Sequence, residues 1–307
     1  MRVVYLGTPE FAVLPLKAVY AKKGVEIIAV VCNKDKPTGR KQILTAPPVK
    51  VTAESLNIPV FQYDKIRTEG VSELKKLNPD LMITCAFGQI LSQEILDIPK
   101  NGVLNVHASL LPAYRGASPI HYALLNGEKR TGVTIMKTDA GIDTGDIMLQ
   151  KSIEIGEKET CGELFGRLSA LGADCISEAL DFIMQNKAVF VKQDDEKATY
   201  TKIIKKKQAE IVWTDGAEKI VNTVRAFNPA PVAFTYLNGE PFKIYSAEKR
   251  DISGAAGRVL VSDKELIVGA GENAVSLLRV CKAGGKPMSA ADFLRGNGIP
   301  AGTVFGR

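Results

Sequence analysis

The chain has 307 residues, of which 45% are hydrophobic, 24% are charged and 7% are aromatic. This length predicts two domains, each large enough to bury a core of its own, and the hydrophobic fraction excludes intrinsic disorder. The net charge of +6 is concentrated in two short segments, 34–50 and 192–207. Concentrated positive charge is typical of proteins that bind a polyanion such as nucleic acid, although two solvated lysine-rich loops would have the same composition.

Membrane-spanning and metal-binding proteins are not expected from this composition. The apolar run Ile27–Cys32 is far shorter than the roughly 20 residues that a membrane helix needs, and Gly7 and Pro9 interrupt the apolar start of the chain before it resembles a signal peptide. Five dispersed cysteines without a CxxC pair fit reduced thiols. With two histidines in the chain, a His-based zinc site is not expected. We expect a cytoplasmic protein without a metal.

Strands and helices are predicted to alternate through residues 1–190. Apolar, β-branched runs predict strands at Val3–Leu6, Val25–Cys32, Leu81–Cys85, Val103–His107, Thr131–Thr138 and Ile147–Ile155. Helical patterns predict helices at Phe11–Lys22, Val49–Leu56, Gly70–Leu77 and Cys161–Gln185. This alternation predicts an α/β domain with a Rossmann-like, mostly parallel sheet, which places ligands beyond the carboxyl ends of its strands. The first turn reads GTPEF, which excludes the GxGxxG fingerprint of dinucleotide binding.

After residue 190 the pattern changes. Residues 191–207 are polar and charged without a clear period, and we assign them to a basic linker. Beyond it the sequence predicts a helix at Thr214–Phe227 and short strands at Val232–Leu237, Phe242–Ala247, Gly257–Val261, Glu265–Ala270 and Ala274–Val280. Turn signals such as Asn238-Gly239 separate these strands. A small OB-like β-barrel is therefore predicted over 208–307.

The densest polar cluster follows the strand Val103–His107. Asn105 and His107 are two residues apart, so their side chains project from one face of that strand near its carboxyl end. An amide donor beside an imidazole could bind an oxyanion and move a proton. A histidine satisfied by backbone groups, with Asn105 capping the loop, would show the same pattern.

The loop Asp139-Ala-Gly-Ile-Asp143-Thr-Gly145 follows the next predicted strand. Its spacing does not match a calcium-binding loop, and a tight turn that exposes one carboxylate explains it better. If this loop folds over the strand end, Asp143 meets His107 and orients its imidazole. Between the two motifs, Leu110 and Leu111 could line a site for a flat ring or could fill the core.

The pattern Asn105-x-His107, Ser109-Leu-Leu-Pro112 and the D-x-G-x-D-T-G loop resembles the formyltetrahydrofolate-dependent formyltransferases. The resemblance runs along most of the chain and includes GTPEFAVLPL, KPTGR, APPVK, AFGQIL, NVHASLLPAYRGASPI, GVTIMKTDAGIDTGDIM and RAFNPAP. It is strongest to the branch of this family that acts on initiator methionyl-tRNA. It implies that the formyl group of 10-formyltetrahydrofolate passes to the α-amino group of methionine on that tRNA, without a metal.

The resemblance also implies residue roles. Asn105 and protonated His107 would stabilise the oxyanion of the tetrahedral intermediate, and Asp143 would support the imidazolium and the proton transfer. The folate would contact Ser109, Leu110, Leu111 and Pro112, with Phe87, Gly88, Ile90 and Asp139 completing its pocket. The tRNA would contact Lys34, Lys36, Arg40 and Lys41 in the first basic segment and Lys202, Lys205, Lys206 and Lys207 in the second. We expect a monomer without an obligate protein partner.

Two positions depart from the family pattern. The family's basic loop often reads GRGKK where this chain has Gly39-Arg40-Lys41-Gln42-Ile43, and Ala230 stands where a Trp often follows FNP. Three alternatives remain. A formyltransferase for a small acceptor should lack the basic loop and the barrel, a formyltetrahydrofolate hydrolase should lack the added domain, and an RNA-binding module without catalysis should not need Asn105, His107 and Asp143.

Overall fold

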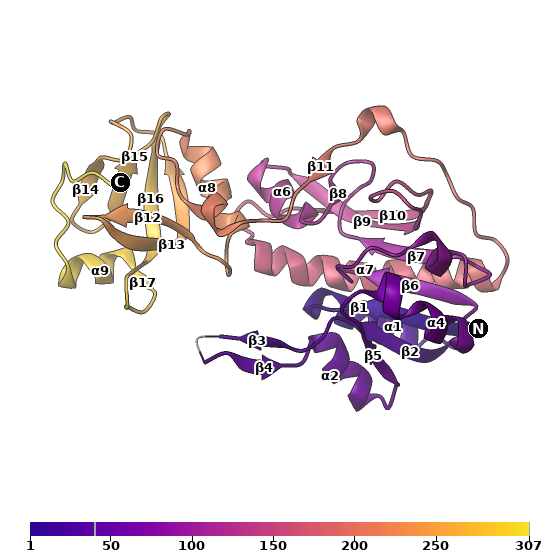
Figure 1. The fold of residues 1–307 in the computed structure, drawn as a ribbon. Coiled ribbons are helices and arrows are strands. Elements are labelled where there is room, and N and C mark those ends of the chain that lie inside the picture. Colours follow the sequence, from indigo (N-terminus) through magenta and orange to yellow (C-terminus); the bar gives the residue numbers. More distant parts are fainter. Residues whose placement is uncertain (40, 307) are drawn as a thin grey trace. The chain divides into compact units, whose positions relative to one another are not determined.

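The computed structural model describes residues 1–39 and 41–306. The chain forms two compact units (Figure 1). Unit 1 comprises Met1–Pro119, Arg130–Glu154 and Phe165–Lys202, and unit 2 comprises Ile120–Lys129, Ile155–Leu164 and Ile203–Arg307. The chain thus passes between the units repeatedly, and each unit has its own sheet.

Unit 1 is built on a seven-stranded sheet with the order β10-β9-β7-β6-β1-β2-β5. Its strands are β1 (Arg2–Gly7), β2 (Glu26–Cys32), β5 (Val60–Gln62), β6 (Leu81–Cys85), β7 (Val103–His107), β9 (Arg130–Lys137) and β10 (Ile147–Glu154). The pairs from β7 to β5 are parallel, whereas β9 and β10 are antiparallel to their neighbours. The predicted mostly parallel sheet is confirmed, and its central strands are near-continuous apolar runs because helices cover both faces.

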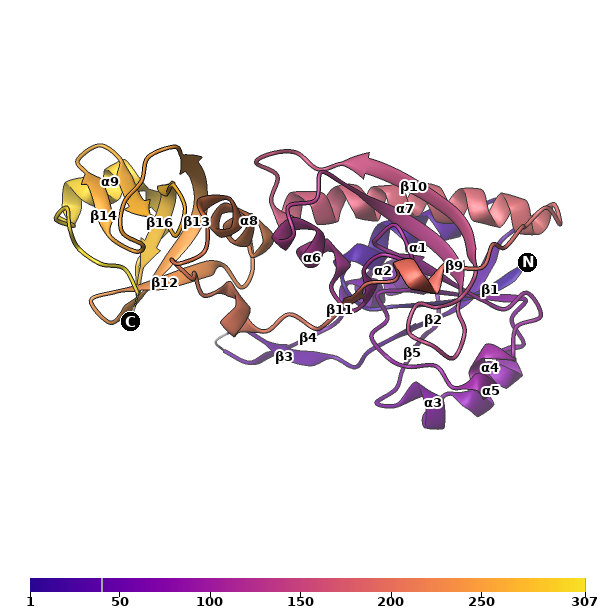
Figure 2. The ribbon, with the colours of Figure 1, turned by 90° about the horizontal axis from the view of Figure 1, so that it is seen from above.

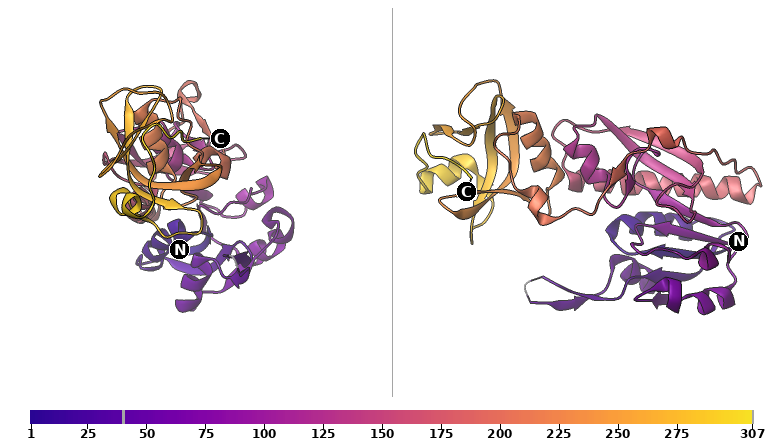
Figure 3. Two further views of the ribbon diagram at one scale, coloured as in Figure 1. Left: turned by 90° about the vertical axis from the view of Figure 1, so that its left-hand side faces the viewer. Right: turned by 45° about the horizontal axis from the view of Figure 1, so that its top comes forward.

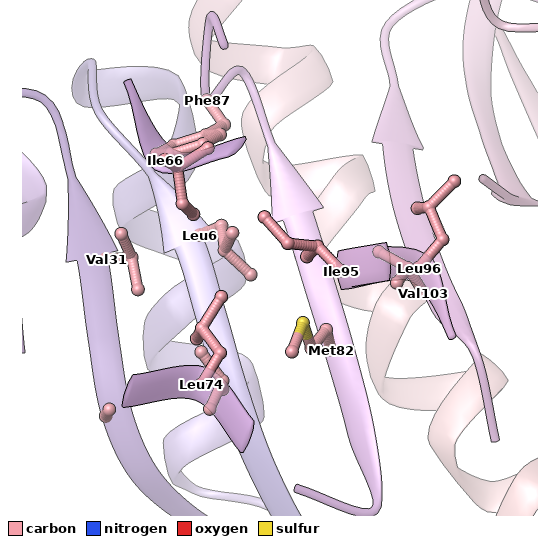
Figure 4. Close-up of a cluster of buried hydrophobic side chains, with 11 residues drawn as sticks. Leu6, Val31, Ile66, Leu74, Met82, Phe87, Ile95, Leu96 and Val103 are labelled. Atoms are coloured by element: carbon pink, nitrogen blue, oxygen red, sulfur yellow. The ribbon is translucent and has the colours of Figure 1, made fainter. Parts of the chain in front are cut away.

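One face of this sheet carries a hydrophobic core cluster (Figure 4). Alternate residues of β1 and β2, such as Leu6 and Val31, point to this face together with Met82 of β6. Short helices cover them: α3 (Ile66–Glu69), α4 (Val71–Leu77) and α5 (Gln93–Leu96). Leu74 and Ile95 from these helices complete the contact.

The opposite face packs against longer helices. The short 3-10 helix η1 (Glu10–Ala12) leads into α1 (Val13–Tyr20), and the Tyr5 hydroxyl donates to the Ala12 carbonyl at 2.7 Å. The helix α7 (Cys161–Met184) packs on the same side, where a Cβ at Gly172 would lie 3.0 Å from Val106 of β7. The absence of a side chain at Gly172 therefore allows helix and strand to approach closely.

The first basic segment contains a hairpin where the sequence indicated a loop. Strands β3 (Lys36–Thr38) and β4 (Ile43–Thr45) pair antiparallel and extend from unit 1 as an arm (Figure 2). Each strand has three residues, which is too few to show a period of two. The helix α2 (Pro48–Ser55) follows, and a Lys50–Asp35 ion pair of 3.0 Å closes the base of the arm.

Unit 2 contains an antiparallel sheet with the order β12-β13-β16-β15-β14. Its strands are β12 (Ala233–Leu237), β13 (Glu240–Arg250), β14 (Val259–Ser262), β15 (Leu266–Gly269), β16 (Ala274–Lys282) and β17 (Met288–Ser289), which pairs with β16. The turn at Asn238-Gly239 has positive φ at both residues, as the dipeptide predicts. A C-terminal antiparallel sheet domain is confirmed, while closure into an OB-like barrel stays a prediction.

Helices and aromatic rings fill the core of unit 2. The helix α8 (Ala217–Ala226) packs along β13 and β16, and α9 (Ala290–Gly296) lies against β16 (Figure 3). The ring centroid of Phe242 lies 5.3 Å from those of Phe293 and Phe305, and the ring centroid of Trp213 lies 5.8 Å from that of Phe305. The helix α6 (Pro119–Leu125) and the short strands β8 (Arg115–Gly116) and β11 (Tyr200–Thr201) were not predicted.

Two general properties follow from the described residues. None of the helices in residues 1–39 and 41–306 has both the length and the apolar character that crossing a membrane requires. The five cysteines are buried as free thiols. Burial raises the pKa of Cys85, at the end of β6, to about 12, so this thiol stays protonated and is a poor nucleophile.

Candidate active site

Asn105 and His107 lie on β7, next to the centre of the sheet of unit 1 (Figure 1). Asp143 lies in the loop after β9, and β9 pairs with β7, so this loop lies beside the same strand. Asp143 adopts a left-handed backbone conformation with a φ of +53°, which Asp tolerates better than most residues. The structure therefore brings together the three residues that the sequence singled out for catalysis.

The carboxylate of Asp143 is the meeting point of the cluster. Its Oδ1 accepts a hydrogen bond from Asn105 Nδ2 at 3.3 Å, and its Oδ2 accepts one from the Gly116 amide at 2.7 Å. His107 Nδ1 lies 3.6 Å from the same Oδ2. His107 is 6% exposed and Asp143 17% exposed, so water screens the contact between these two side chains little.

The contact of the second ring nitrogen determines the tautomer of His107. Nε2 lies 3.0 Å from the carbonyl oxygen of Tyr114. A carbonyl oxygen can only accept, so Nε2 carries a hydrogen. The other ring nitrogen, Nδ1, faces the Asp143 carboxylate.

Thr84 orients the Asn105 amide and was not found from the sequence. The register of β6 and β7 places Thr84 beside Asn105, and its hydroxyl donates to Asn105 Oδ1 at 3.0 Å. Because this bond occupies the amide oxygen, the amide nitrogen must face Asp143. Thr84 is a polar residue in an otherwise apolar strand, and pairing the two predicted strands in register would have placed it beside Asn105.

Asp139 supports the turn that carries Asp143. Its carboxylate accepts from the Gly141 amide at 3.0 Å and from the Thr144 hydroxyl at 2.7 Å. A Cβ at Gly145 would lie 1.7 Å from the Lys137 carbonyl, so the turn requires glycine there. The loop is thus held in a compact form by its own side chains.

The Ser109–Pro112 segment is tied to β9 and β10. Thr134 Oγ1 donates to the Ser109 carbonyl at 2.7 Å and accepts from the Leu111 amide at 3.1 Å. Leu111 is buried, whereas Leu110 and Pro112 are half-buried. The loop after β6 carries the other residues predicted for folate: Phe87 is buried in the core cluster, while Gly88 and Ile90 are exposed.

The predicted RNA-contacting residues divide between the two basic segments. Lys36 is exposed on β3 and Lys41 in the turn of the hairpin, whereas Lys34 forms an ion pair of 2.5 Å with Asp64. Arg40 lies outside the described residues. Lys202, Lys205, Lys206 and Lys207 are all exposed. Across residues 1–39 and 41–306, no group of three or more His, Cys, Asp or Glu side chains is placed to hold a metal ion.

The chain is similar to known proteins over most of its length. The family model described as "Formyl transferase" matches residues 1–180, and the model described as "Formyl transferase, C-terminal domain" matches residues 203–298. The chain is 43% identical to the methionyl-tRNA formyltransferase of Geobacter sulfurreducens, covering 100% of this chain and 97% of that protein. It is also 43% identical to the Bacillus subtilis protein of the same name, covering 99% and 98%.

Solved structures share the fold at lower identity. The N-formyltransferase from Helicobacter canadensis, in complex with folinic acid and dTDP-3-aminofucose, has a TM-score of 0.68 at 21% identity and covers 90% of this chain and 98% of that one. HypX from Aquifex aeolicus, in complex with tetrahydrofolic acid, has a TM-score of 0.62 at 18% identity and covers 96% and 47%. With both family models matched and full-length relatives at 43% identity, the chain belongs to the formyl transferase family.

Proposed function

We propose that this enzyme transfers the formyl group of 10-formyltetrahydrofolate to the α-amino group of methionine on initiator tRNA. The observation that carries the proposal is the Asn105–Asp143–His107 cluster in a chain whose full-length relatives are named methionyl-tRNA formyltransferase. The exposed lysines of the hairpin and of residues 202–207 support a polyanionic acceptor.

In the proposed reaction the methionyl amine attacks the formyl carbon. A new C–N bond forms while the C=O bond opens to a tetrahedral oxyanion, and the bond from the formyl carbon to N10 of the folate then breaks. We assign the oxyanion to Asn105 Nδ2, which has a second hydrogen beside the one it gives Asp143, and to the positive charge of protonated His107. Donors of this kind are worth about 3–4 kcal/mol each in other acyl transfers because they are already oriented before charge develops.

Asp143 and His107 are the groups that we propose for moving the proton from the amine to N10. The attacking amine loses a proton and the departing N10 gains one, so one proton moves across the site in each turnover. Asp143 is the acceptor nearest to His107 Nδ1, and the two bonds from Asn105 and Gly116 hold its carboxylate in place. We propose that Asp143 takes the amine proton and that Asp143 and His107 together return it to N10.

For the folate we propose contacts with Ser109–Pro112 and with the exposed loop at Gly88 and Ile90. The polar edge of a pterin needs backbone donors and acceptors, which these segments contain, and Ile90 and Leu110 offer apolar surface to its ring. Asp139 would act through the turn it supports, because its carboxylate is occupied by Gly141 and Thr144. Phe87 would act from the core beneath this loop.

For the RNA we propose phosphate contacts at Lys36, Arg40 and Lys41 of the first segment and at Lys202 and Lys205–Lys207 of the second. Lys34 would have to exchange its Asp64 partner for a phosphate. Such contacts supply affinity and salt dependence but little sequence information. We further propose that 1–190 is the catalytic domain, that 191–207 is a basic linker to an RNA-binding domain at 208–307, and that the enzyme acts as a cytoplasmic monomer.

The test is a formyl-transfer assay with four acceptor conditions at two salt concentrations. The enzyme receives 10-formyltetrahydrofolate with charged initiator tRNA, charged elongator tRNA, glycinamide ribonucleotide or no acceptor. We expect formylation of the initiator alone, weakened by salt. Activity on the small acceptor alone would overturn the RNA assignment, and turnover without an acceptor would indicate a hydrolase.

A further inference from the structure

Residues 191–201, which the sequence assigned to the linker, lie alongside the active-site loops of unit 1. Val191 exchanges two backbone hydrogen bonds of 2.8 Å with Ile147 at the start of β10. Further along, β11 pairs in parallel with β8, and the Arg115 amide donates to the Thr199 carbonyl at 2.8 Å. This segment therefore connects the loop of Asp143 with the loop after β7.

Gln193 lies between these two anchors with every polar group of its amide engaged. Its Nε2 donates to the carbonyl oxygens of Asp143 at 2.8 Å and Gly145 at 2.7 Å. Its Oε1 accepts from Arg115 Nε at 3.1 Å and Nη2 at 2.9 Å. Gln193 is 6% exposed, so water does not replace these partners.

Arg115 fixes the orientation of that amide. Its side chain is 1% exposed, and its Nη2 also donates to Asp195 at 2.7 Å while Nη1 donates to the Tyr200 hydroxyl at 3.2 Å. An Arg fork that binds Oε1 through two nitrogens excludes the flipped amide, because the flip would turn its NH₂ group toward the guanidinium. Nε2 must therefore point to the Asp143 loop.

We propose that Gln193 is the positioning residue for Asp143 and that Arg115 sets its orientation. Asp143 has a left-handed φ, and Gln193 binds its carbonyl together with the carbonyl of Gly145. Holding both carbonyls fixes the peptide groups that follow Asp143 and Gly145, and thereby the place of the Asp143 carboxylate. The expected effect on formyl transfer rests on the proposed function, whereas the role of Gln193 in holding the Asp143 loop does not.

The first test compares Gln193→Met, Gln193→Glu and a control, Ser169→Ala. Met keeps the length of Gln but removes both donors, and Glu keeps a partner for Arg115 while offering no donor to the two carbonyls. Ser169 is buried in unit 1 and donates only to the Phe11 carbonyl, at 2.7 Å, away from the site. We expect kcat to fall about tenfold or more in both Gln193 variants with the KM for folate nearly unchanged, and to stay at the wild-type value in the control.

A double-mutant cycle with Asp143→Asn separates positioning from general destabilisation. If Gln193 acts through the Asp143 carboxylate, Gln193→Met costs about tenfold in the wild-type background and less than about twofold in the Asp143→Asn background. Single-turnover measurements with enzyme in excess make the slow variants accessible. The inference would be overturned if the losses from Gln193→Met and Asp143→Asn multiplied, or if Ser169→Ala with an equally lowered urea midpoint lost as much kcat.

Amide hydrogen exchange gives a readout that does not depend on the reaction. The Gly116 amide donates to the Asp143 carboxylate, so displacement of this carboxylate should speed exchange at Gly116 and within 139–146. We expect this acceleration in Gln193→Met and not in Ser169→Ala. Unchanged exchange would overturn the positioning role. A wild-type enzyme without formyl transfer would overturn the proposed function instead, while exchange would still test Gln193.

Discussion

At the scale of single residues, the site works by restricting hydrogen-bond choices. Asn105 has its oxygen bound by Thr84, so its nitrogen is the group left free for the proposed oxyanion. His107 has Nε2 bound by the Tyr114 carbonyl, so Nδ1 is the nitrogen that faces Asp143. In each side chain one polar atom is used for orientation, and this leaves the other atom in a defined place for chemistry.

Asn105→Ala should remove one oxyanion donor. We expect kcat to fall by about 10²–10³ with little change in the KM for folate, because the donor acts on charge that develops after binding. Steady-state formylation of charged initiator tRNA measures both constants. An unchanged kcat would show that Asn105 has no role in stabilising the oxyanion.

Thr84→Val should release the Asn105 amide while keeping the shape of the side chain. Loss of one neutral hydrogen bond is worth about 1 kcal/mol, so we expect kcat to fall about fivefold. Thr84→Ser keeps the hydroxyl and should retain most of the activity. Equal losses in the two variants would mean that packing of the Thr84 methyl group matters, and not the hydrogen bond.

The sequence pointed to Asn105, His107 and Asp143 because each carries its own signal in a short motif. Thr84 and Gln193 carry no such signal. Thr84 becomes recognisable once β6 and β7 are paired in register, and Gln193 depends on a buried arginine that lies far away in the sequence. Partners joined through space by tertiary folding cannot be found from local patterns.

At the scale of elements, apolar strands were the most predictable parts of the fold. The bounds of β6 and β7 agree with the prediction because both are short apolar runs that end at turn residues or polar residues. The hairpin β3–β4 was not predicted, since its six strand residues are all exposed and its pairing is supported by a hydrogen bond between the Thr38 and Thr45 hydroxyls at 2.5 Å. A strand without a buried face has no hydrophobic pattern to detect.

Charge reversal on the hairpin should weaken RNA binding without changing the chemical step. Lys36→Glu with Lys41→Glu should raise the KM for charged tRNA and reduce the slope of log K against log salt by about 1–2. We expect an unchanged kcat at saturating tRNA. Lys23→Glu, an exposed lysine outside both basic segments, is the matched control. Equal effects at Lys23 would indicate a general charge effect.

Glu163 forms a capping box at the start of α7. Its carboxylate accepts from the Thr160 amide at 2.8 Å and the Thr160 hydroxyl at 2.7 Å, and these bonds lower the pKa of Glu163. A lowered pKa in the folded state stabilises the fold above the ordinary Glu range, and this stability is lost as the pH falls through the lowered pKa. Glu163→Gln should therefore lower Tm more at pH 7 than at pH 3. A constant difference at the two pH values would exclude the charge as its source.

At the scale of the whole molecule, the chain passes between the two units at several points, and α7 itself has its first residues in unit 2 and the rest in unit 1. A helix that contributes to both cores should couple their unfolding. Met82→Ala removes a buried side chain from the core cluster of unit 1 and should cost about 2–5 kcal/mol.

The single tryptophan of the chain, Trp213, lies in the core of unit 2 and reports on that unit. We expect Met82→Ala to lower the urea midpoint of Trp213 fluorescence together with that of the far-ultraviolet circular dichroism. A tryptophan transition that stays at the wild-type midpoint would show that the two units unfold independently.

Because the chain passes between the two units several times, the positions at which it can be fused to a relative in a chimeric protein are restricted. In a chimera with a crossover at residue 190, the relative's residue would replace Gln193. The carbonyls of Asp143 and Gly145 and the guanidinium of Arg115 would then have to bond to that residue. A crossover after Lys202 keeps Gln193 with its partners. Residues 120–129 and 155–164 would then come from one parent and the rest of unit 2 from the other. A chimera that exchanges unit 2 as a whole therefore has to exchange 120–129, 155–164 and 203–307 together, which a single crossover cannot do.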